Sequence, residues 1–511
     1  MRSVDVAIIG AGFAGVCAAI RSRQAGLSFV VIEKGESPGG VWRENNYPGI
    51  ACDVPSMLYS YSFEPKLDWG HVYAKGREIH DYIVQCARKY GVYDDILCNK
   101  EVTDAAFDEK SGTWSVHCAG GETIRSRVLV SAVGQLSRPK IPDIEGLDRF
   151  RGNAFHSAHW DHAYDFRGKS VAVMGNGASA IQIVPEIAPV VDKLTLFQRS
   201  PSWVDSKPDR PYTPDEHRRF RILPLLARYI RWKLFWNGER NSSRYQKDTE
   251  GSAALRERCL ASIDRHIADP QKREALRPQY AVGCKRLLKS NDWYPALARD
   301  NVSIVTSRIE RMTEDGVVTA DGQHHRLDAI VFATGFHATR FLTPMKITGL
   351  AGADLASRWR DGAQAYRGVA VPGFPNFFVM YGPNTNTHNS IVGMLEGQAE
   401  YIVKRAKRLV RKRIYEHVKE GPFQKYSDMV QAKVGKYAWS DDCGNWYKEI
   451  GGIVTNNWPD YAHRYRLMMR RNDDRNYIVS SPVEALAATS GADATANRYA
   501  ARPAHGVGEA R

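Results

Sequence analysis

Two glycine-rich turns, far apart in the chain, have the residue types that bind dinucleotides. The first comprises Gly10, Ala11, Gly12, Phe13, Ala14 and Gly15, and the second comprises Gly175, Asn176, Gly177, Ala178, Ser179 and Ala180. Glycines let backbone N–H groups approach a pyrophosphate at the positive end of the following helix. Such a turn alone is weak evidence, but each one here follows an apolar run and precedes a helical stretch. We therefore expect two dinucleotide sites.

The residues that follow the next apolar run differ between the two turns. Glu33 lies 18 residues after Gly15, where a carboxylate can accept hydrogen bonds from both ribose hydroxyls. The second turn is followed instead by Gln198, Arg199 and Ser200. A carboxylate there would repel a 2′-phosphate, whereas a guanidinium binds one with charge-assisted hydrogen bonds. The second nucleotide is therefore predicted to be NADPH rather than NADH, with an ordinary surface role for Arg199 as the alternative.

A loop-rich aromatic block at 39–63 fits a flat ring better than it fits a plain core. Glycines stand beside Trp42, and the run from Tyr47 to Asp53 contains a Tyr-Pro-Gly turn. Asp53 either caps a turn or orients a cation in an active site. Together with Glu33, this block favours FAD as the first dinucleotide. The further residues expected to contact FAD are Lys34, Gly40, Val41, Trp42, Asp53, Tyr59 and Val102.

The segment Phe150–Asp161, called the connecting segment below, lies between the two glycine-rich turns. By itself, His156 with Trp160 four residues later predicts a helix start in which an imidazole packs on an indole. Its position between two nucleotide sites predicts instead that it senses whether both are occupied.

Composition describes an ordinary globular protein. The chain has 511 residues, 43% hydrophobic and 25% charged, enough for two or three domains. Its eight cysteines include no C-x-x-C pair. This pattern argues against a structural zinc site, a disulfide scaffold and a dithiol redox centre, and is typical of a reducing compartment. We expect a cytoplasmic protein with no metal.

The net charge of +14 is densest at 404–413, where apolar residues form one helical stripe and cations cover the rest. A solvated helix face is the favoured explanation, contact with a membrane surface is a weaker one, and nucleic acid is weaker still. The first apolar run begins almost at residue 1, which leaves no room for a signal peptide. No apolar run reaches the length of a membrane span. The oligomeric state stays open between monomer and homodimer.

The apolar runs that precede the turns are typical of buried parallel strands, so the fold class is α/β with two Rossmann-like domains. We assign 1–140 and 370–483 to a discontinuous FAD domain and 141–369 to an NADP domain. A helical, aromatic-rich insertion at 205–282 interrupts the second domain. Residues 484–511 are rich in Ala, Gly and Arg and are expected to be a disordered tail.

The connecting segment has the pattern F-x-G-x-x-x-H-x-x-x-W-D, formed by Phe150, Gly152, His156, Trp160 and Asp161. It resembles the fingerprint of type I Baeyer–Villiger monooxygenases. The ordinary flavin-containing and N-hydroxylating monooxygenases have a shorter pattern that lacks the Trp-Asp extension. The resemblance covers roughly residues 4–470, including Ala333-Thr334-Gly335 and the 39–63 block.

This resemblance implies that NADPH reduces FAD and that O2 then forms a flavin C4a-peroxide, which converts ketones to esters or lactones. The peroxide must stay deprotonated, and a fixed cation stabilises it. By the resemblance this cation is Arg286, oriented by Asp53, while Lys285 helps Arg199 to bind the 2′-phosphate. Arginine suits the role because it does not act as an acid.

Other parts of the chain carry weaker expectations. Residues 445–448 and 456–459 fall where such enzymes have a mobile loop over the substrate, although core aromatic residues would look similar. The alternative reaction is oxidation of nitrogen or sulfur, which needs a protonated hydroperoxide. An electron-transfer reductase and a non-catalytic flavoprotein sensor are the remaining alternatives.

Overall fold

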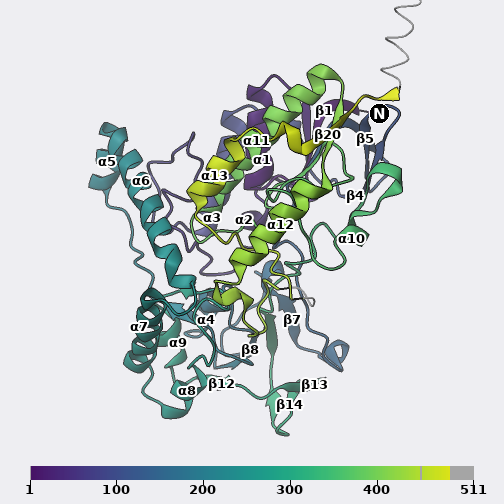
Figure 1. Ribbon diagram of the computed structural model, residues 1–511. Coiled ribbons are helices and arrows are strands. Elements are labelled where there is room, and N and C mark those ends of the chain that lie inside the picture. Colours follow the sequence, from purple (N-terminus) through teal and green to yellow (C-terminus); the bar gives the residue numbers. More distant parts are fainter. Residues whose placement is uncertain (1, 449–451, 484–511) are drawn as a thin grey trace, which may run out of the picture.

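The computed structural model describes residues 2–448 and 452–483. The fold is organised around two parallel-rich sheets, each with its own core (Figure 1). The tail predicted at 484–511 lies outside the described residues.

The first sheet has the strand order β17-β4-β5-β6-β1-β2-β3, and β18 pairs with β6. Its parallel centre consists of β6, β1 and β2, in which every residue from Val6 to Ile9 is buried. The helices α1 (Phe13–Gln24), α3 (Gly76–Lys89) and α11 (Ile391–Lys412) supply residues to its main core. The strands are β1 (Arg2–Ile9), β2 (Phe29–Ile32), β3 (Ile96–Leu97), β4 (Val102–Asp108), β5 (Thr113–Cys118), β6 (Thr123–Ser131), β17 (Lys346–Thr348) and β18 (Phe377–Val379).

The second sheet is entirely parallel, in the order β12-β9-β8-β16-β7. Its central strands are continuous apolar runs, as expected when helices or loops cover both faces. The helices α4 (Ala180–Ile187) and α9 (Trp293–Leu297) pack together in its core. The strands are β7 (Asn153–His156), β8 (Ser170–Met174), β9 (Lys193–Phe197), β12 (Val302–Val305) and β16 (Ala329–Phe332). Beside them lies an antiparallel sheet of β13 (Ile309–Thr313), β14 (Gly316–Thr319) and β15 (His324–Arg326).

The insertion after β9 is helical, as predicted. It contains α5 (Pro214–Ile222), α6 (Pro224–Asn241), the short turn η4 (Ser242–Tyr245), α7 (Glu250–His266) and α8 (Pro270–Ala275). The pair β10 (Val204–Asp205) and β11 (Leu288–Lys289) closes its base. This closure brings the start and end of the insertion together, so Lys285 and Arg286 emerge next to the second sheet.

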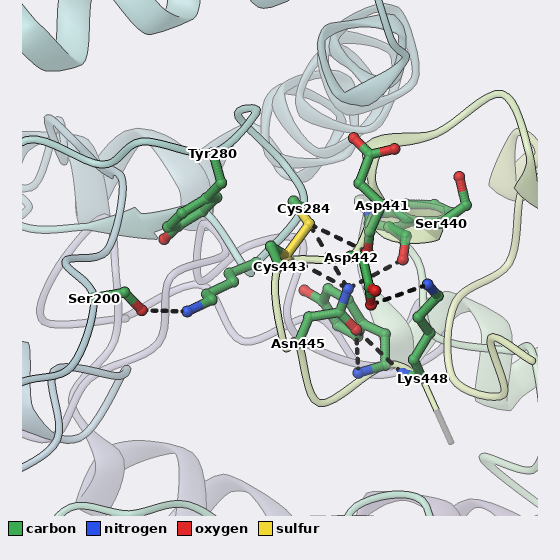
Figure 2. The surroundings of a disulfide bond; sticks show 12 residues. Ser200, Tyr280, Cys284, Ser440, Asp441, Asp442, Cys443, Asn445 and Lys448 are labelled. Carbon is green, nitrogen blue, oxygen red and sulfur yellow. Dashed lines mark hydrogen bonds and ion pairs between the residues drawn. A yellow bond between two sulfur atoms is a disulfide. The ribbon is translucent and has the colours of Figure 1, made fainter. Parts of the chain in front are cut away.

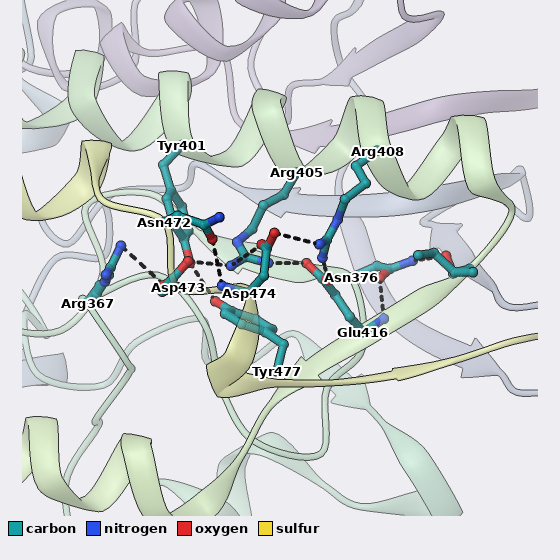
Figure 3. A network of polar contacts seen from close by, with 11 residues as sticks. Arg367, Asn376, Tyr401, Arg405, Arg408, Glu416, Asn472, Asp473, Asp474 and Tyr477 are labelled. Atoms are coloured by element: carbon teal, nitrogen blue, oxygen red, sulfur yellow. Dashed lines mark hydrogen bonds and ion pairs between the residues drawn. The ribbon is translucent and has the colours of Figure 1, made fainter.

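After β18 the chain packs α11 on α1 and α13 on α11. A buried network of charges joins α11 to the last strands: Arg405 pairs with Glu416 and Asp473, and Tyr401 donates to Asp473 at 2.9 Å (Figure 3). The elements are α12 (Glu420–Val434), α13 (Ala462–Arg470), β19 (Tyr415–Val418) and β20 (Tyr477–Ser480), with the short helices α2 (Val41–Glu44) and α10 (Leu355–Arg358) earlier in the chain.

The explanation of 404–413 as a solvated face is only partly right. Lys404 and Lys407 are exposed, but Arg405 is buried within the network just described. The apolar stripe, which includes Ile402, Ala406 and Leu409, packs into the main core. This stripe therefore has no free face for a membrane.

The connecting segment is not a helix start. Its first half is β7, an edge strand, followed by the turn η3 (Ser157–His159). His156 packs edge-on against Phe336, whereas Trp160 packs on Phe155 and Phe166. The predicted contact between His156 and Trp160 is therefore wrong. His156 ends a strand and a short turn separates it from Trp160, so the two side chains do not share one face of a helix.

Candidate active site

The first glycine-rich turn has a shape that only glycine allows. Gly10 has a φ of +99°, and a Cβ there would lie 2.7 Å from the carbonyl oxygen of Ala132. A Cβ on Gly15 would lie 1.8 Å from the carbonyl oxygen of Gly10. Gly12 instead faces Gly40, another glycine, with its Cβ position 3.6 Å from the Gly40 Cα. The two glycines let the backbone of the turn and the backbone of the aromatic block approach closely, since side chains would separate them.

Glu33 ends β2 beside this turn and is 4% exposed. Its carboxylate accepts the N–H of Ala11 and the N–H of Gly35, each at 2.8 Å, and pairs with Arg43 at 3.3 Å. A carboxylate has about four acceptor positions, so capacity remains for a ribose hydroxyl. Val102 is buried at the start of β4, and Lys34 is half-exposed and pairs with Glu44 at 3.4 Å.

The aromatic block adds a wall to the first site. The Trp42 Nε1–H donates to the Tyr59 hydroxyl at 3.2 Å, and the two rings meet edge to face. Phe13, from the start of α1, packs edge-on against Tyr59. Gly40 has a φ of +55°, which lets the chain turn sharply into α2 beside Trp42. These contacts fit the prediction that the block surrounds a flat ring.

The second turn opens α4, which begins at Ala180 with Ser179 before it. A Cβ on Gly175 would lie 2.5 Å from the carbonyl oxygen of Ala333, whereas one on Gly177 would meet no heavy atom of the described residues within 4 Å. Asn176 ties this turn to the next strand by donating to Gln198 at 2.7 Å and to the Ser200 carbonyl at 2.8 Å. Ala178 lies between these groups, in the stretch whose backbone would face a pyrophosphate.

Cations gather beside this second turn. Lys285 donates to the Ser200 hydroxyl (Figure 2), and Arg199 is exposed next to it. Burial lowers the pKa of Lys285, and the charge of Arg199 lowers it further. Neither cation forms an ion pair with a carboxylate within residues 2–448 and 452–483. Two neighbouring cations without an anion fit a 2′-phosphate.

Arg286 and Asp53 meet between the two sheets, although 233 residues separate them in the chain. The Arg286 Nη2–H donates to the Asp53 carboxylate at 2.6 Å. Their side chains keep 38% and 28% of their surface accessible, although protein surrounds the pair.

The pair holds its charges firmly. The charge of Asp53 raises the pKa of Arg286 above its usual value, even though burial opposes this. Burial pushes the pKa of Asp53 upward, but the charge and hydrogen bond of Arg286 outweigh it and leave that pKa below its usual value. Arg286 is therefore a permanent cation at this site.

Aromatic side chains from three segments surround Arg286. Tyr381 and Tyr447 lie near enough to interact with its charge, and burial raises the pKa of Tyr381 to about 12. His388 stacks on Tyr245 with ring centres 3.8 Å apart. Burial, followed by the charge of Arg286, lowers the pKa of His388 to about 3, so this imidazole is neutral at physiological pH. Aromatic rings thus surround Arg286, and Lys207 and Lys289 lie near enough to Asp53 for their charges to lower its pKa as well.

A disulfide lies directly beside Arg286. Cys284, two residues earlier, is bonded to Cys443, and the sulfur atoms join the end of the insertion to the 440–448 loop (Figure 2). The expectation that the cysteines form no disulfide is wrong for this pair. The sequence separation of 159 hides the pairing, because only the tertiary structure brings the two segments together. The other six cysteines are free.

Sequence reasoning also missed Gln182, which connects the two halves of the site. Its side chain, on α4 of the second sheet, donates to the Ala51 carbonyl at 2.9 Å and accepts from the Tyr47 hydroxyl at 3.2 Å. It therefore holds the loop that carries Asp53. No pattern marks this glutamine in the sequence, because its partners lie 131 and 135 residues away.

The connecting segment lies apart from Arg286. His156 is 2% exposed, and its Nε2–H donates to the Gly335 carbonyl at 3.0 Å. Its Nδ1 accepts the N–H of Ala158, so this imidazole holds its place by two hydrogen bonds. The Gly335 carbonyl also accepts the N–H of Lys140. This contact brings together the two segments that connect the sheets, one between β6 and β7 and the other between β16 and β17.

The remaining residues of this segment shape its turns. A Cβ on Gly152 would lie 2.4 Å from both the Asp328 carbonyl oxygen and the Phe150 ring, so only glycine fits. Asp161 accepts from the Asn153 side chain at 2.8 Å and from the N–H of Ala163 at 2.9 Å. These residues therefore hold the turns of the segment in place by sterics and hydrogen bonds.

Sequence comparison identifies close relatives of this arrangement. Residues 7–225 match the family model described as pyridine nucleotide-disulphide oxidoreductase. A Baeyer–Villiger monooxygenase of Pseudomonas aeruginosa is 40% identical over 95% of this chain and 93% of its own. One from Streptomyces coelicolor is 39% identical over 96% of this chain and 95% of its own.

The chain belongs to the Baeyer–Villiger monooxygenase family.

Solved structures of the same family share the whole architecture. A steroid monooxygenase bound to NADP superposes with a TM-score of 0.85 at 29% identity, covering 94% of this chain and all of that one (100%). A structure of OTEMO in complex with FAD and NADP gives a TM-score of 0.85 at 27% identity, covering 93% of this chain and 99% of that one. The protein is thus an NADPH-dependent flavoprotein monooxygenase with FAD and NADP as its cofactors, and the predicted α/β fold with two Rossmann-like domains is confirmed. No helix among the described residues is long and apolar enough to span a membrane.

Proposed function

We propose that this chain oxidises a ketone to an ester or a lactone and that Arg286, oriented by Asp53, is the cation that stabilises the reacting oxygen. The overall reaction takes ketone, O2, NADPH and a proton to ester, water and NADP+. The Arg286–Asp53 pair carries the proposal, since it fixes a permanent cation among aromatic side chains. When bound, FAD supplies the oxygen nucleophile for this reaction after it has been reduced by NADPH.

Arg286 would serve this reaction in two ways. A negative charge on oxygen is costly in an apolar cavity, and a guanidinium already fixed in place lowers that cost without rearrangement. Because its pKa is raised above the usual value, Arg286 does not give a proton to that oxygen. The same property disfavours nitrogen or sulfur oxidation, which needs a protonated oxygen donor.

The surrounding rings define the class of ketone. Tyr245, Tyr381, Tyr447 and His388 present apolar faces, and their protonated or neutral forms add no negative charge to the cavity. We infer a ketone whose bulk is apolar and whose carbonyl is its main polar group.

The cofactor sites follow from the two turns. FAD is assigned to Gly10, Gly12, Glu33 and the 39–63 block, since the glycine turn opens α1 and Glu33 lies beside it with acceptor capacity left for a ribose hydroxyl. NADPH is assigned to Gly175, Gly177, Arg199, Ser200 and Lys285, where two cations lack a carboxylate partner in the part of the chain that the structure describes.

The domains and the connecting segment extend the proposal. Since β17 pairs with β4 of the first sheet, we place the return to the FAD domain between β16 and β17, earlier than residue 370. His156 then braces both crossings between the domains through the Gly335 carbonyl, as a residue that couples NADPH occupancy to domain closure would. We place the protein in the cytoplasm, where NADPH is supplied.

A ketone panel with the Arg286→Ala variant tests the reaction. The wild type should form esters from apolar ketones, while the variant should still oxidise NADPH through flavin reduction but form no ester. Arg277→Ala, which removes an arginine paired with Asp264 on the helical insertion, is the matched control and should behave as wild type. Ester formation by Arg286→Ala would remove Arg286 from the mechanism, and turnover of amines or sulfides alone would refute ketone oxidation.

A further inference from the structure

The helices α5 and α6 form a hairpin (residues 214–241) with an unusual outer surface. Leu225, Tyr229, Trp232 and Trp236 are 74%, 57%, 58% and 42% exposed. Their spacing of four, three and four residues places them on one stripe of α6, called the outer stripe below. Ile222 and Leu223, at the turn between the helices, are 64% and 55% exposed and extend this surface to the tip.

The apolar side chains of the outer stripe are exposed although both helices of the hairpin are anchored to the rest of the molecule. The opposite face of α6 buries Ala227 in the main core, and Arg231 donates to the Met57 and Ser60 carbonyls. On α5, Phe220 is buried and Thr213 and Glu216 form a capping box. In Figure 1 the two helices stand out from the body of the molecule at the left. The hairpin is therefore a fixed projection that carries large apolar side chains on its outside.

Cations frame this surface. Arg228 and Lys233 are exposed and flank the outer stripe on its two sides, and Arg218 and Arg221 are exposed on α5 near the tip. No acidic residue occurs between Glu216 and Glu239 in the sequence. A second copy of the chain would bring these cations against each other, so self-association through this surface is disfavoured.

We propose that the α5–α6 hairpin binds the surface of an anionic lipid bilayer. Tryptophan and tyrosine prefer the boundary between headgroups and acyl chains, and leucine and isoleucine at the tip would reach below it. Arginine and lysine on the same surface pair with lipid phosphates while their stems cover apolar area. A convex ridge with this composition suits a fluid surface, which can close around it.

The hairpin connects the proposed lipid contact to the residues around Arg286. Helix α6 has 18 residues and spans about 27 Å, from the exposed tip to η4, where Tyr245 stacks on His388 beside Arg286. Asn389, the residue after His388, donates to the Phe235 carbonyl and to Glu239 on α6, so the hairpin is anchored to the wall of the active site.

Vesicle flotation of the full-length flavoprotein tests the proposal. The wild type should float with vesicles of phosphatidylcholine mixed with phosphatidylglycerol, and high salt should weaken this binding. The double variant Leu225→Glu/Trp232→Glu should bind at least about tenfold more weakly, as should Arg228→Glu/Lys233→Glu, since each reversed charge opposes the lipid. Ile141→Glu, at another exposed apolar residue, is the matched control and should float as wild type does.

All substituted side chains are exposed, so each variant should fold. Retained flavin absorbance checks this. The comparison uses neutral vesicles of phosphatidylcholine alone. Wild type that binds neither the anionic nor the neutral vesicles would overturn the proposal, as would equal binding to both. A concentration-dependent oligomer that the Leu225→Glu/Trp232→Glu variant loses, without vesicle binding by the wild type, would assign the surface to a second copy instead.

Discussion

At the scale of single residues, Arg286 and Asp53 come from different halves of the molecule, and we propose that Asp53 fixes the guanidinium for the reaction. The contact of 2.6 Å sets both the direction of the guanidinium and its charge. The aromatic rings around it add no charge of their own at physiological pH.

Replacing Asp53 by asparagine tests this dependence. The variant keeps the size of the side chain but removes its charge, so Arg286 loses its orientation. We expect ester formation to fall on the order of 100-fold, because small misplacements of a reacting group have effects of that size. Hydrogen peroxide released per NADPH should rise while flavin binding persists; unchanged ester yield would show that Arg286 needs no partner.

The pH dependence of this pair has a definite sign. The folded pKa of Asp53 is below its ordinary 3.8, so the contribution of the pair to stability is present above that value and is lost as pH falls through the folded pKa. In acid titrations followed by circular dichroism, Asp53→Asn should therefore lose less stability than wild type below about 3.8. An equal loss of stability at low pH in the variant and in the wild type would exclude this effect.

His156 should produce a separate pH effect. Burial lowers its pKa from 6.5 to about 4, so the unfolded chain binds more protons between these values. The melting temperature of the wild type should thus fall as pH decreases from 6.5 to about 4. His156→Gln should flatten this dependence, while the control His162→Gln, an exposed histidine of the next turn, should leave it unchanged.

At the scale of elements, the Cys284–Cys443 disulfide joins the segment of Arg286 to the 440–448 loop. Asn445 keeps that loop folded by donating to the Trp439 carbonyl at 3.0 Å, and Tyr447 reaches the charge of Arg286. One bond therefore restrains a wall of the active site.

Replacing Cys443 by serine should release this restraint. The bond closes a loop of 159 residues, so its loss should lower the free energy of unfolding by on the order of 2–5 kcal/mol. Protease cleavage near 440–448 should become faster, and a reducing agent should reproduce both effects in the wild type. The control is Cys98→Ser, at a free cysteine; equal stability of Cys443→Ser and wild type would indicate that the bond contributes nothing.

At the scale of the whole molecule, the candidate site joins segments of the two units that are built around the two sheets. Gln182 holds the Asp53 loop from the second sheet, and His156 holds both crossings between the sheets. Gln182 is on the helix that the second turn opens, so we predict that occupancy of the second nucleotide site affects the position of Asp53.

Gln182→Ala should weaken this link. We expect NADPH to reduce the flavin at a nearly normal rate, because the nucleotide contacts are unchanged, while the yield of ester per NADPH falls severalfold. Gln271→Ala, at an exposed glutamine of α8, serves as the control. Normal coupling in the Gln182 variant would mean that the Asp53 loop holds its position without help from the second sheet.

The sequence alone determined the parts of this protein that depend on neighbours in the chain. Glycine turns between apolar runs predicted two Rossmann-like units, and the residues after those runs distinguished FAD from NADPH, because φ preferences, periodicity and local charge act over a few residues. The connecting segment indicated the family by its residue types, although its predicted helix was wrong.

Only the tertiary structure decided what lies between those parts. The disulfide, the glutamine at 182 and the exposed stripe on α6 depend on residues more than a hundred positions apart or on which helix face the core covers. The same limit applies to Arg405, whose charge looked solvated in the sequence but is neutralised inside the core by Glu416 and Asp473. Long-range pairing is set by packing of the whole chain, and for that reason no local pattern reveals it.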